Sequence, residues 1–183
     1  MLSRNEWVKV CEAATGLKTH IERRQQSLEF QLNRPIQQLL TLVNGAGRPE
    51  GWEITDQPPD GLMERTNFDG HPTLHVMTRA DAAASWRTSV LLSQGRYRFE
   101  GRAQVVGVQP LPYGTHQGAG LRIGGAVRQE RSLIGDVSWQ MLTADFAVEE
   151  PRAEVELVCE LRAHSGEAWF DLDSLRVVRT NDL

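Results

Sequence analysis

The sequence predicts a mainly β protein, an antiparallel β-sandwich preceded by an N-terminal α-helical extension. Two observations support this. Apolar residues recur every three or four positions over residues 4–33, whereas after Gly51 they alternate with polar residues. Turn-forming residues also separate many short alternating runs, and no helical run intervenes between them. Many short strands without intervening helices are typical of a sandwich or a barrel.

The composition excludes several classes of protein. The chain has 183 residues, of which 40% are hydrophobic, and a formal net charge of −4. This length suffices for one ordinary core. The slight acidity argues against a nucleic-acid partner, which requires a clustered basic surface. Two cysteines, Cys11 and Cys159, exclude a disulfide-rich scaffold and a four-cysteine zinc site.

Targeting signals are absent from the sequence. Charged residues interrupt the first 30 positions, so no apolar stretch there forms a signal-peptide core. The longest charge-free stretch nearby, residues 35–47, is too short for a membrane span. The expected compartment is cytoplasmic if the chain is complete and extracytoplasmic if it is a fragment of an exported protein.

Residues 1–40 form the predicted helical segment. Ser3 followed by Glu6 matches a capping box, and Pro35 ends the helical pattern. An isolated helix of this length is only marginally stable in water, so its apolar stripe requires burial. The stripe packs either across a sheet or against the same helix of another chain, and we expect the second arrangement, a homo-oligomer. It consists of Trp7, Val10, Cys11, Ala14, Leu17, Ile21, Leu28 and Leu32.

Residues 41–183 form the predicted β-sandwich domain. Residues 97–105 and 155–161 alternate between apolar and polar side chains, as half-buried strands do. Turn residues such as Asp69-Gly70 and Gln94-Gly95 separate the runs. The other predicted strands are residues 51–55, 63–66, 73–78, 87–92, 118–123, 137–143, 144–148 and 167–178.

An ordered series of motifs resembles a known family. The motifs are residues 42–45 (Leu-Val-Asn-Gly), 51–52 (Gly-Trp), 68–70 (Phe-Asp-Gly), 85–87 (Ser-Trp-Arg), 95–99 (Gly-Arg-Tyr-Arg-Phe) and 166–175, which begin Gly-Glu-Ala-Trp-Phe-Asp. Over residues 42–179 this order resembles the galactose-binding-like jelly rolls, especially the carbohydrate-binding modules found beside secreted polysaccharide-degrading enzymes. The resemblance implies a jelly-roll β-sandwich that binds a polysaccharide or another glycan without catalysis.

The ligand-binding prediction combines aromatic and polar side chains. Trp86, Tyr113 and Trp139 are candidate platforms for a sugar ring, and a core position is the alternative for both tryptophans. Tyr113 stands in a sequence typical of a loop, which favours exposure. The polar candidates near the same sheet face or rim are His116, Arg122 and Gln140.

Asp171 is the candidate metal ligand. In the resembling modules the matching Asp helps to bind a structural calcium together with an acidic residue from the opening motif. Here Arg48 closes the opening motif and the expected Glu is missing, whereas calcium prefers several carboxylates. An Asp171 that is hydrogen-bonded at a strand bulge is therefore the favoured alternative, and we expect no cofactor.

Catalytic motifs are not evident. His71 and His75 have the spacing of a helical metal pair, but on a strand their backbones lie about 13 Å apart. Residues 118–125 are rich in glycine but lack the dinucleotide-binding spacing. We therefore expect no enzyme. Two functions remain: a noncatalytic carbohydrate-binding domain of a larger or assembled protein, or a structural or protein-interaction sandwich joined to partners through the N-terminal helix.

Overall fold

The computed structural model describes residues 38–114, 117–126 and 132–180. The predicted helix over residues 4–33 lies outside this part, and so does His116. Within the described part the secondary structure consists of strands and turns, with no helix long and apolar enough to cross a membrane. The strands are β1 (Ala46–Gly47), β2 (Glu53–Asp56), β3 (Gly61–Phe68), β4 (His71–Thr78), β5 (Ala82–Gln109), β6 (Gly118–Ile123), β7 (Gly135–Ala163), β8 (Ser165–Asp171) and β9 (Arg176–Thr180).

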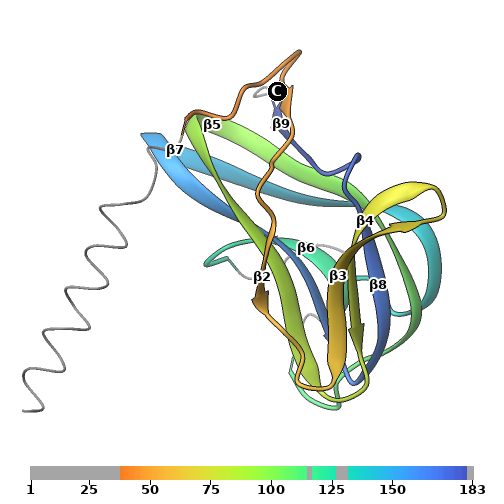
Figure 1. Cartoon of the computed structure of the whole chain (residues 1–183). Helices are drawn as coiled ribbons and strands as arrows, with labels where there is room; N and C mark the ends of the chain where they lie inside the picture. The colour runs from red at the N-terminus through yellow and green to blue at the C-terminus, as the bar shows by residue number, and fades with distance from the viewer. Residues whose placement is uncertain (1–37, 115–116, 127–131, 181–183) are drawn as a thin grey trace, which may run out of the picture. The chain divides into compact units, whose positions relative to one another are not determined.

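Two long strands, β5 and β7, organise one curled antiparallel sheet (Figure 1). They pair with each other along most of their length. The first half of β5 also pairs with β2, and the second half of β7 pairs with β6. The second half of β5 pairs with β8 and β9, and the order continues from β8 through β4 to β3. Both halves of the curled sheet therefore contribute to one sandwich-like core.

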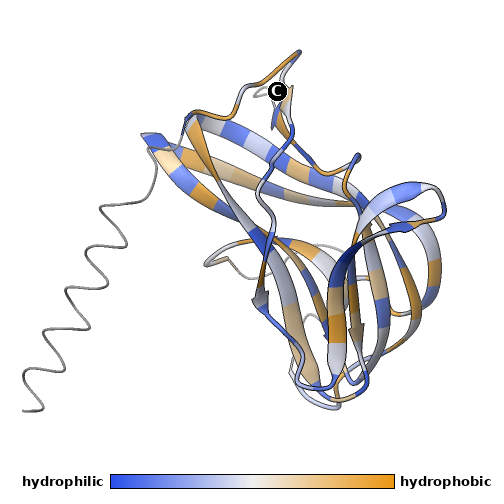
Figure 2. Ribbon diagram, viewed as in Figure 1, coloured by the Kyte–Doolittle hydropathy of each residue, from blue (hydrophilic) through white to orange (hydrophobic). Residues whose placement is uncertain are grey.

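The core follows the period-two alternation of the strands. Hydrophobic and hydrophilic residues form alternating bands along β5 and β7 in Figure 2. Leu74 of β4, Phe99 of β5, Leu157 of β7 and Phe170 of β8 have no exposed surface. Their apolar side chains meet inside the curl, so burial of one face of every long strand stabilises the fold.

The predicted turn at Gln94-Gly95 is wrong, because β5 runs through it without reversing. Gly95 lies at a shift in register between β5 and β7, with φ of +156°. A glycine fits a bulge as well as a turn, and a side chain there would crowd the Arg179 guanidinium. In the same way, the strands predicted over residues 137–143, 144–148 and 155–161 are parts of β7.

The predicted strand over residues 167–178 is interrupted after Asp171. The Asp171 carboxylate accepts a hydrogen bond from the backbone N–H of Asp173 at 3.0 Å, and its carbonyl accepts one from the N–H of Ser174 at 3.1 Å. Aspartate commonly closes a turn on its own backbone in this way. The turn separates β8 from β9, which pair with different stretches of β5.

Candidate functional site

Trp86 belongs to the core, which corrects its prediction as an exposed platform. Its side chain is 4% exposed, and its indole N–H donates to the carbonyl of His75 at 3.1 Å. Both the ring and its polar group are thus already engaged within the protein, so the ring has no free face for a ligand.

The other predicted residues are spread over the domain. Tyr113 is 62% exposed in the loop between β5 and β6. Arg122 of β6 donates to the Glu160 carboxylate at 3.2 Å and is largely buried. Gln140 is exposed on β7 next to Trp139. The side chains that contact Trp139 come instead from β5 and from the hairpin of β3 and β4.

A β-bulge turns Trp139 to the outer face of the sheet. Ala103 of β5 pairs with Gln140, but Val105, two residues further on, pairs with Val137. Between these two pairs, β7 therefore advances by three residues while β5 advances by two. The extra residue on β7 breaks the regular alternation, so that side chains of β7 on either side of it point to different faces than unbroken pairing would give. Val137 packs against the core, whereas Trp139 is half-buried on the opposite face.

The tip of the β3–β4 hairpin meets Trp139 there. Asp69 and Gly70 form its two-residue turn with φ of +51° and +78°, as a type I′ turn requires. The indole N–H of Trp139 donates to the Asp69 carboxylate at 3.4 Å. The rings of Phe68 and His71 have centroids 6.4 and 5.8 Å from that of Trp139. Residues on both sides of the turn thus surround one indole.

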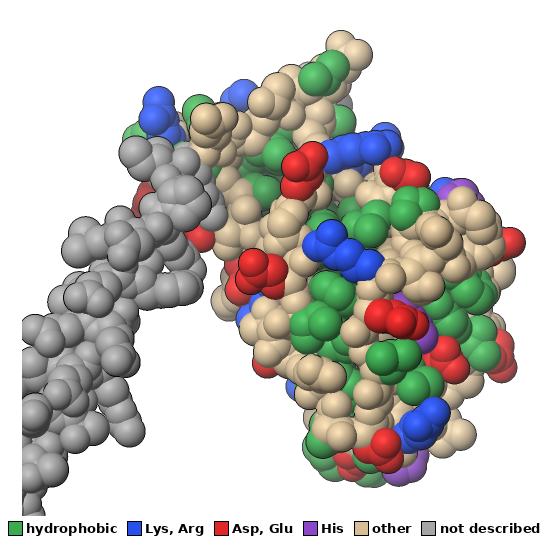
Figure 3. Space-filling model, viewed as in Figure 1, with side chains coloured by type: hydrophobic (Ala, Val, Ile, Leu, Met, Phe, Trp, Pro, Cys, Tyr) green, Lys and Arg blue, Asp and Glu red, His purple; other side chains and the backbone are tan. Residues whose placement is uncertain are grey.

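Arg102 completes this group from β5. Its guanidinium carbon lies 6.0 Å from the centroid of the Trp139 ring, within the range of a cation–π contact. We call Phe68, Asp69, His71, Arg102 and Trp139 the Trp139 face. In the view of Figure 3, hydrophobic and acidic side chains lie side by side over the strands of this half of the sheet.

A stack of rings supports the Trp139 face from β8. Phe68 stacks on Trp169 with centroids 4.3 Å apart, and Trp169 stacks on His75 at 4.8 Å. Trp169 is only 7% exposed because these two rings cover it. His75 lies between two carboxylates, 3.0 Å from Glu167 and 3.6 Å from Glu64. The stack fixes Phe68, and with it the hairpin tip.

Asp171 holds Arg102 in place and does not have the surroundings of a calcium ligand. It is fully buried, and its Oδ2 accepts hydrogen bonds from Nε and Nη2 of Arg102 at 3.1 and 2.5 Å. Its Oδ1 accepts the backbone N–H of Asp173. No group of three or more acidic, His or Cys side chains in the described part is arranged to hold a metal ion. In the described structure Asp171 therefore forms a buried ion pair, and the calcium alternative stays a prediction.

The second half of the sheet carries a separate set of ion pairs. Asp56 accepts hydrogen bonds at 2.6 Å from both Ser85 and Arg87, and Arg87 also contacts Glu156 at 3.1 Å. The hydrogen bond from Ser85, followed by that from Arg87, lowers the pKa of Asp56. These charges are already matched within the protein, so they form a structural network. Burial raises the pKa of the Cys159 thiol, which belongs to the core.

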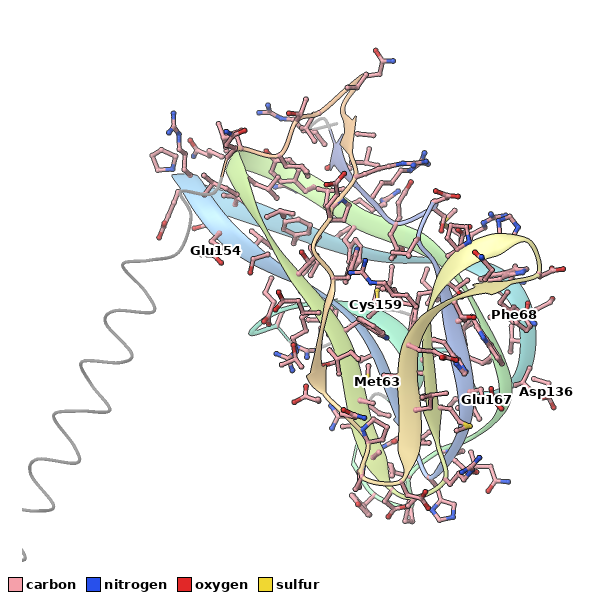
Figure 4. The ribbon with its side chains drawn as sticks, viewed as in Figure 1. Met63, Phe68, Asp136, Glu154, Cys159 and Glu167 are labelled. Carbon is pink, nitrogen blue, oxygen red and sulfur yellow. The ribbon has the colours of Figure 1, made fainter. Side chains whose placement is uncertain are left out.

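Sequence reasoning missed Phe68, His71 and Arg102 as neighbours of Trp139. The available signal was the Phe-Asp-Gly-His sequence, in which two rings flank a hairpin turn. Figure 4 shows Phe68, Asp136 and Glu167 on one side of the ribbon, although they come from three different strands.

No protein-family model matches this chain, and no curated protein matches it. The chain is similar to TmCBM61, a carbohydrate-binding module solved in complex with β-1,4-galactotriose, with 16% identity over 78% of this chain and 100% of that chain and a TM-score of 0.45. It is also similar to the CBM22-1 xylan-binding domain of Paenibacillus barcinonensis Xyn10C, with 13% identity over 75% of this chain and 90% of that chain and a TM-score of 0.42.

A third similar structure is the enzymatically active domain of tailspike protein 4 of bacteriophage CBA120. It has 9% identity over 75% of this chain and 21% of that chain, with a TM-score of 0.43. The similar structures thus include carbohydrate-binding modules and an enzymatic domain.

Proposed function

We propose that the chain is a noncatalytic carbohydrate-binding domain and that the Trp139 face is its binding site. The observation that carries the proposal is a half-buried indole surrounded by polar groups with unused hydrogen-bonding capacity. Nη1 of Arg102, Oδ1 of Asp69 and the ring nitrogens of His71 have no protein partner among the described residues.

These groups match the chemistry of a sugar ring. One face of a pyranose is lined with C–H groups, which pack on an aromatic ring, while its hydroxyls point outward. A guanidinium N–H donates to a hydroxyl, a carboxylate accepts from one, and an imidazole does either. An aromatic surface with a few placed polar groups is the usual composition of a small-ligand site.

The carboxylates beside Trp139 support a binding role without catalysis. Asp69 orients the indole, and Asp171 is buried in its ion pair with Arg102. Hydrolysis of a glycosidic bond generally uses a pair of carboxyl groups that flank the scissile bond, one of them as the proton donor. Asp171 is fully buried in its ion pair with Arg102, so it is not available for such a role.

A direct binding measurement tests this proposal. Affinity electrophoresis and calorimetry of the whole chain with β-1,4-galactan, xylan, mannan and cello-oligosaccharides should show saturable binding to at least one of them. Trp139→Ala should lose it. Tyr113→Ala is the matched control, because it removes an exposed ring outside the Trp139 face and should bind normally. If Tyr113→Ala loses glycan binding and Trp139→Ala keeps it, the binding site lies at the loop between β5 and β6 instead.

The alternative function, an interaction module joined to partners through residues 1–40, depends on the apolar stripe in the sequence. Its predicted helix lies outside the described residues, so it stays a prediction. Sedimentation of the whole chain against a chain starting at Leu40 tests it. Self-association that requires residues 1–39, with no glycan bound, would favour this alternative. If both chains are monomers, the predicted homo-oligomer is excluded.

A further inference from the structure

His75 is a buried histidine with a hydrogen-bond partner at only one of its two ring nitrogens. It stands in β4 with 7% of its surface exposed, and its ring stacks on Trp169 with centroids 4.8 Å apart. Its Nε2 lies 3.0 Å from the carboxylate of Glu167. Its Nδ1 is buried, has no hydrogen-bond partner among the described residues and lies 3.6 Å from Oε1 of Glu64. A buried polar atom without a partner destabilises a fold.

These contacts determine which nitrogen of the neutral ring carries the proton. An ionised carboxylate only accepts hydrogen bonds, so Nε2 of His75 carries the proton and donates to Glu167. Nδ1 then presents a lone pair to the carboxylate of Glu64, and two acceptors form no hydrogen bond. Protonation turns Nδ1 into a donor. The half-exposed side chain of Glu64 then needs to move by only about 0.5 Å to accept a hydrogen bond from it.

The two glutamates belong to strands on opposite sides of β4. Glu64 stands on β3, which ends the sheet and pairs only with β4 among the described strands. Glu167 stands on β8 (Figure 4), which pairs with β4 along one edge and with β5 along the other. A protonated ring that donates to both carboxylates therefore ties the edge strand of the sheet to an interior strand.

Other charged or titratable side chains of the surrounding strands have different neighbours. Asp171 of β8 pairs with Arg102 of β5, and Arg65 of β3 donates to a backbone carbonyl. Gln104 of β5, which lies across from the stacked tryptophan, carries no charge. His71 stands four positions earlier on β4, where its ring contacts Trp139. Among the described residues, the two glutamates are thus the charged groups next to the ring of the buried histidine.

We infer that His75 is a proton-dependent clamp on the β3–β4 hairpin. When Nδ1 is protonated it donates to Glu64 while Nε2 still donates to Glu167, and β3 is joined to β8 across β4. Imidazole side chains commonly titrate between about pH 5 and 8, so the clamp closes as the pH falls through this range and opens as it rises.

The clamp acts on the tip of the hairpin through the ring stack. The ring of His75 stacks on Trp169, and Trp169 stacks on Phe68, which directly precedes the turn at Asp69. A tighter attachment of β3 therefore also holds the hairpin tip. This inference goes beyond the proposed function, because it concerns the order of the hairpin and requires no bound glycan.

Amide hydrogen exchange of the whole chain tests the clamp. Protection factors of the β3 amides that are hydrogen-bonded to β4 are compared at pH 5.5 and pH 8 with those of β5, while NMR follows the titration of His75. The β3 protection should be about 3- to 5-fold higher at pH 5.5, because a charge-assisted hydrogen bond at a partly exposed site favours the closed form by about this factor. An unchanged ratio while His75 titrates overturns the inference. A His75 ring that does not titrate between these pH values overturns it as well.

Variants separate the clamp from other effects of pH. Glu64→Ala removes the acceptor from a half-exposed position and should abolish the difference in β3 protection between the two pH values. His75→Phe keeps a ring on Trp169 without a titratable nitrogen and should also abolish it. Glu150→Ala is the matched control, because it removes an exposed glutamate from β7, which does not pair with β3, β4 or β8, and should keep the wild-type difference.

The Glu64→Ala variant also excludes a contribution from His71. Protonation of His71 does not require Glu64, so any effect of His71 on the hairpin persists in Glu64→Ala. A difference in β3 protection that is the same in Glu64→Ala and in the wild-type chain would therefore overturn the clamp. None of these measurements uses a glycan, so this result leaves the proposed function untouched.

Discussion

The indole N–H of Trp139 and the carboxylate of Asp69 are joined by a hydrogen bond of 3.4 Å across 70 positions of the chain. Asp69 stands at the tip of the β3–β4 hairpin, and Trp139 stands on β7, with β8 and β5 between these elements in the sheet. The bond therefore ties a hairpin tip to a distant strand and sets the orientation of the ring on which the proposed binding depends.

The first prediction concerns this bond. Asp69→Ala should weaken glycan binding about 5-fold or more, because the indole loses its orienting partner, and Asp69→Asn should keep most of the affinity for a neutral glycan because its amide oxygen still accepts the N–H. Calorimetry compares the two variants. Equal losses in both would mean that the charge of Asp69, and not its hydrogen bond, supports binding.

The two tryptophans proposed from the sequence should respond in opposite ways to truncation. Trp86→Ala removes a buried ring and its hydrogen bond to the carbonyl of His75, which should cost about 3–5 kcal/mol of unfolding free energy. Trp139→Ala removes a half-buried ring and should cost only about 1 kcal/mol. Urea unfolding measures both. A large loss of stability in Trp139→Ala would place that ring in the core.

The stability of the protein should depend on the ion pair between Arg102 and Asp171. Arg102→Leu leaves the buried carboxylate of Asp171 without its cation, and we expect a loss of about 2–3 kcal/mol. Arg102→Leu combined with Asp171→Asn should be more stable than Arg102→Leu alone, because no buried charge is left unpaired. A double variant less stable than the single one would contradict this explanation.

The stability contributed by Asp56 should depend on acid pH. Its pKa is lowered in the folded protein by the hydrogen bond from Ser85 and then by Arg87. A carboxyl whose folded pKa lies below its unfolded value, about 4, contributes stability above that pH and loses it as the pH falls through the folded pKa. Ser85→Ala should therefore raise the pKa of Asp56, which carbon NMR of its carboxyl detects. If Ser85→Ala leaves the pKa of Asp56 unchanged, the hydrogen bond from Ser85 does not lower it, and Arg87 is the cause.

Chelation should leave thermal stability unchanged. The charge of Asp171 is already balanced by Arg102, and its oxygens accept hydrogen bonds from Arg102 and from the N–H of Asp173, so we expect no bound calcium there. Thermal unfolding with calcium and with EDTA measures the effect. A calcium-dependent rise in the melting temperature would restore the metal interpretation, since a ligand that binds only the folded state stabilises it.

The class of fold was predictable from the sequence, but the lengths of the strands were not. Apolar and polar residues alternate along β5 and β7 in the sequence, and buried and exposed side chains alternate along much of both strands in the structure. The same alternation could have assigned Trp86 to the core, because it shares its side of the strand with Val90 and Leu92. Gly95 misled the prediction because glycine is compatible with both a turn and a bulge.

The Trp139 face was predictable only in part. Asp69-Gly70 indicates a hairpin turn directly, and Trp139 was one of the candidate platforms. Its outward direction depends on one extra residue in the pairing of β7 with β5, which no local pattern records. Phe68 and Arg102 contact Trp139 because β8 and β5 lie between β4 and β7 in the sheet. Contacts of this kind follow from the order of strands in the sheet and not from residue spacing.

The most direct test of the account is an NMR titration of the five tryptophan indole N–H signals with a neutral oligosaccharide that binds. The Trp139 signal, identified by its absence from Trp139→Phe, should shift in proportion to saturation, while the buried Trp86 signal stays in place. Saturable binding that leaves the Trp139 signal unmoved would contradict the assignment of the binding site to the Trp139 face.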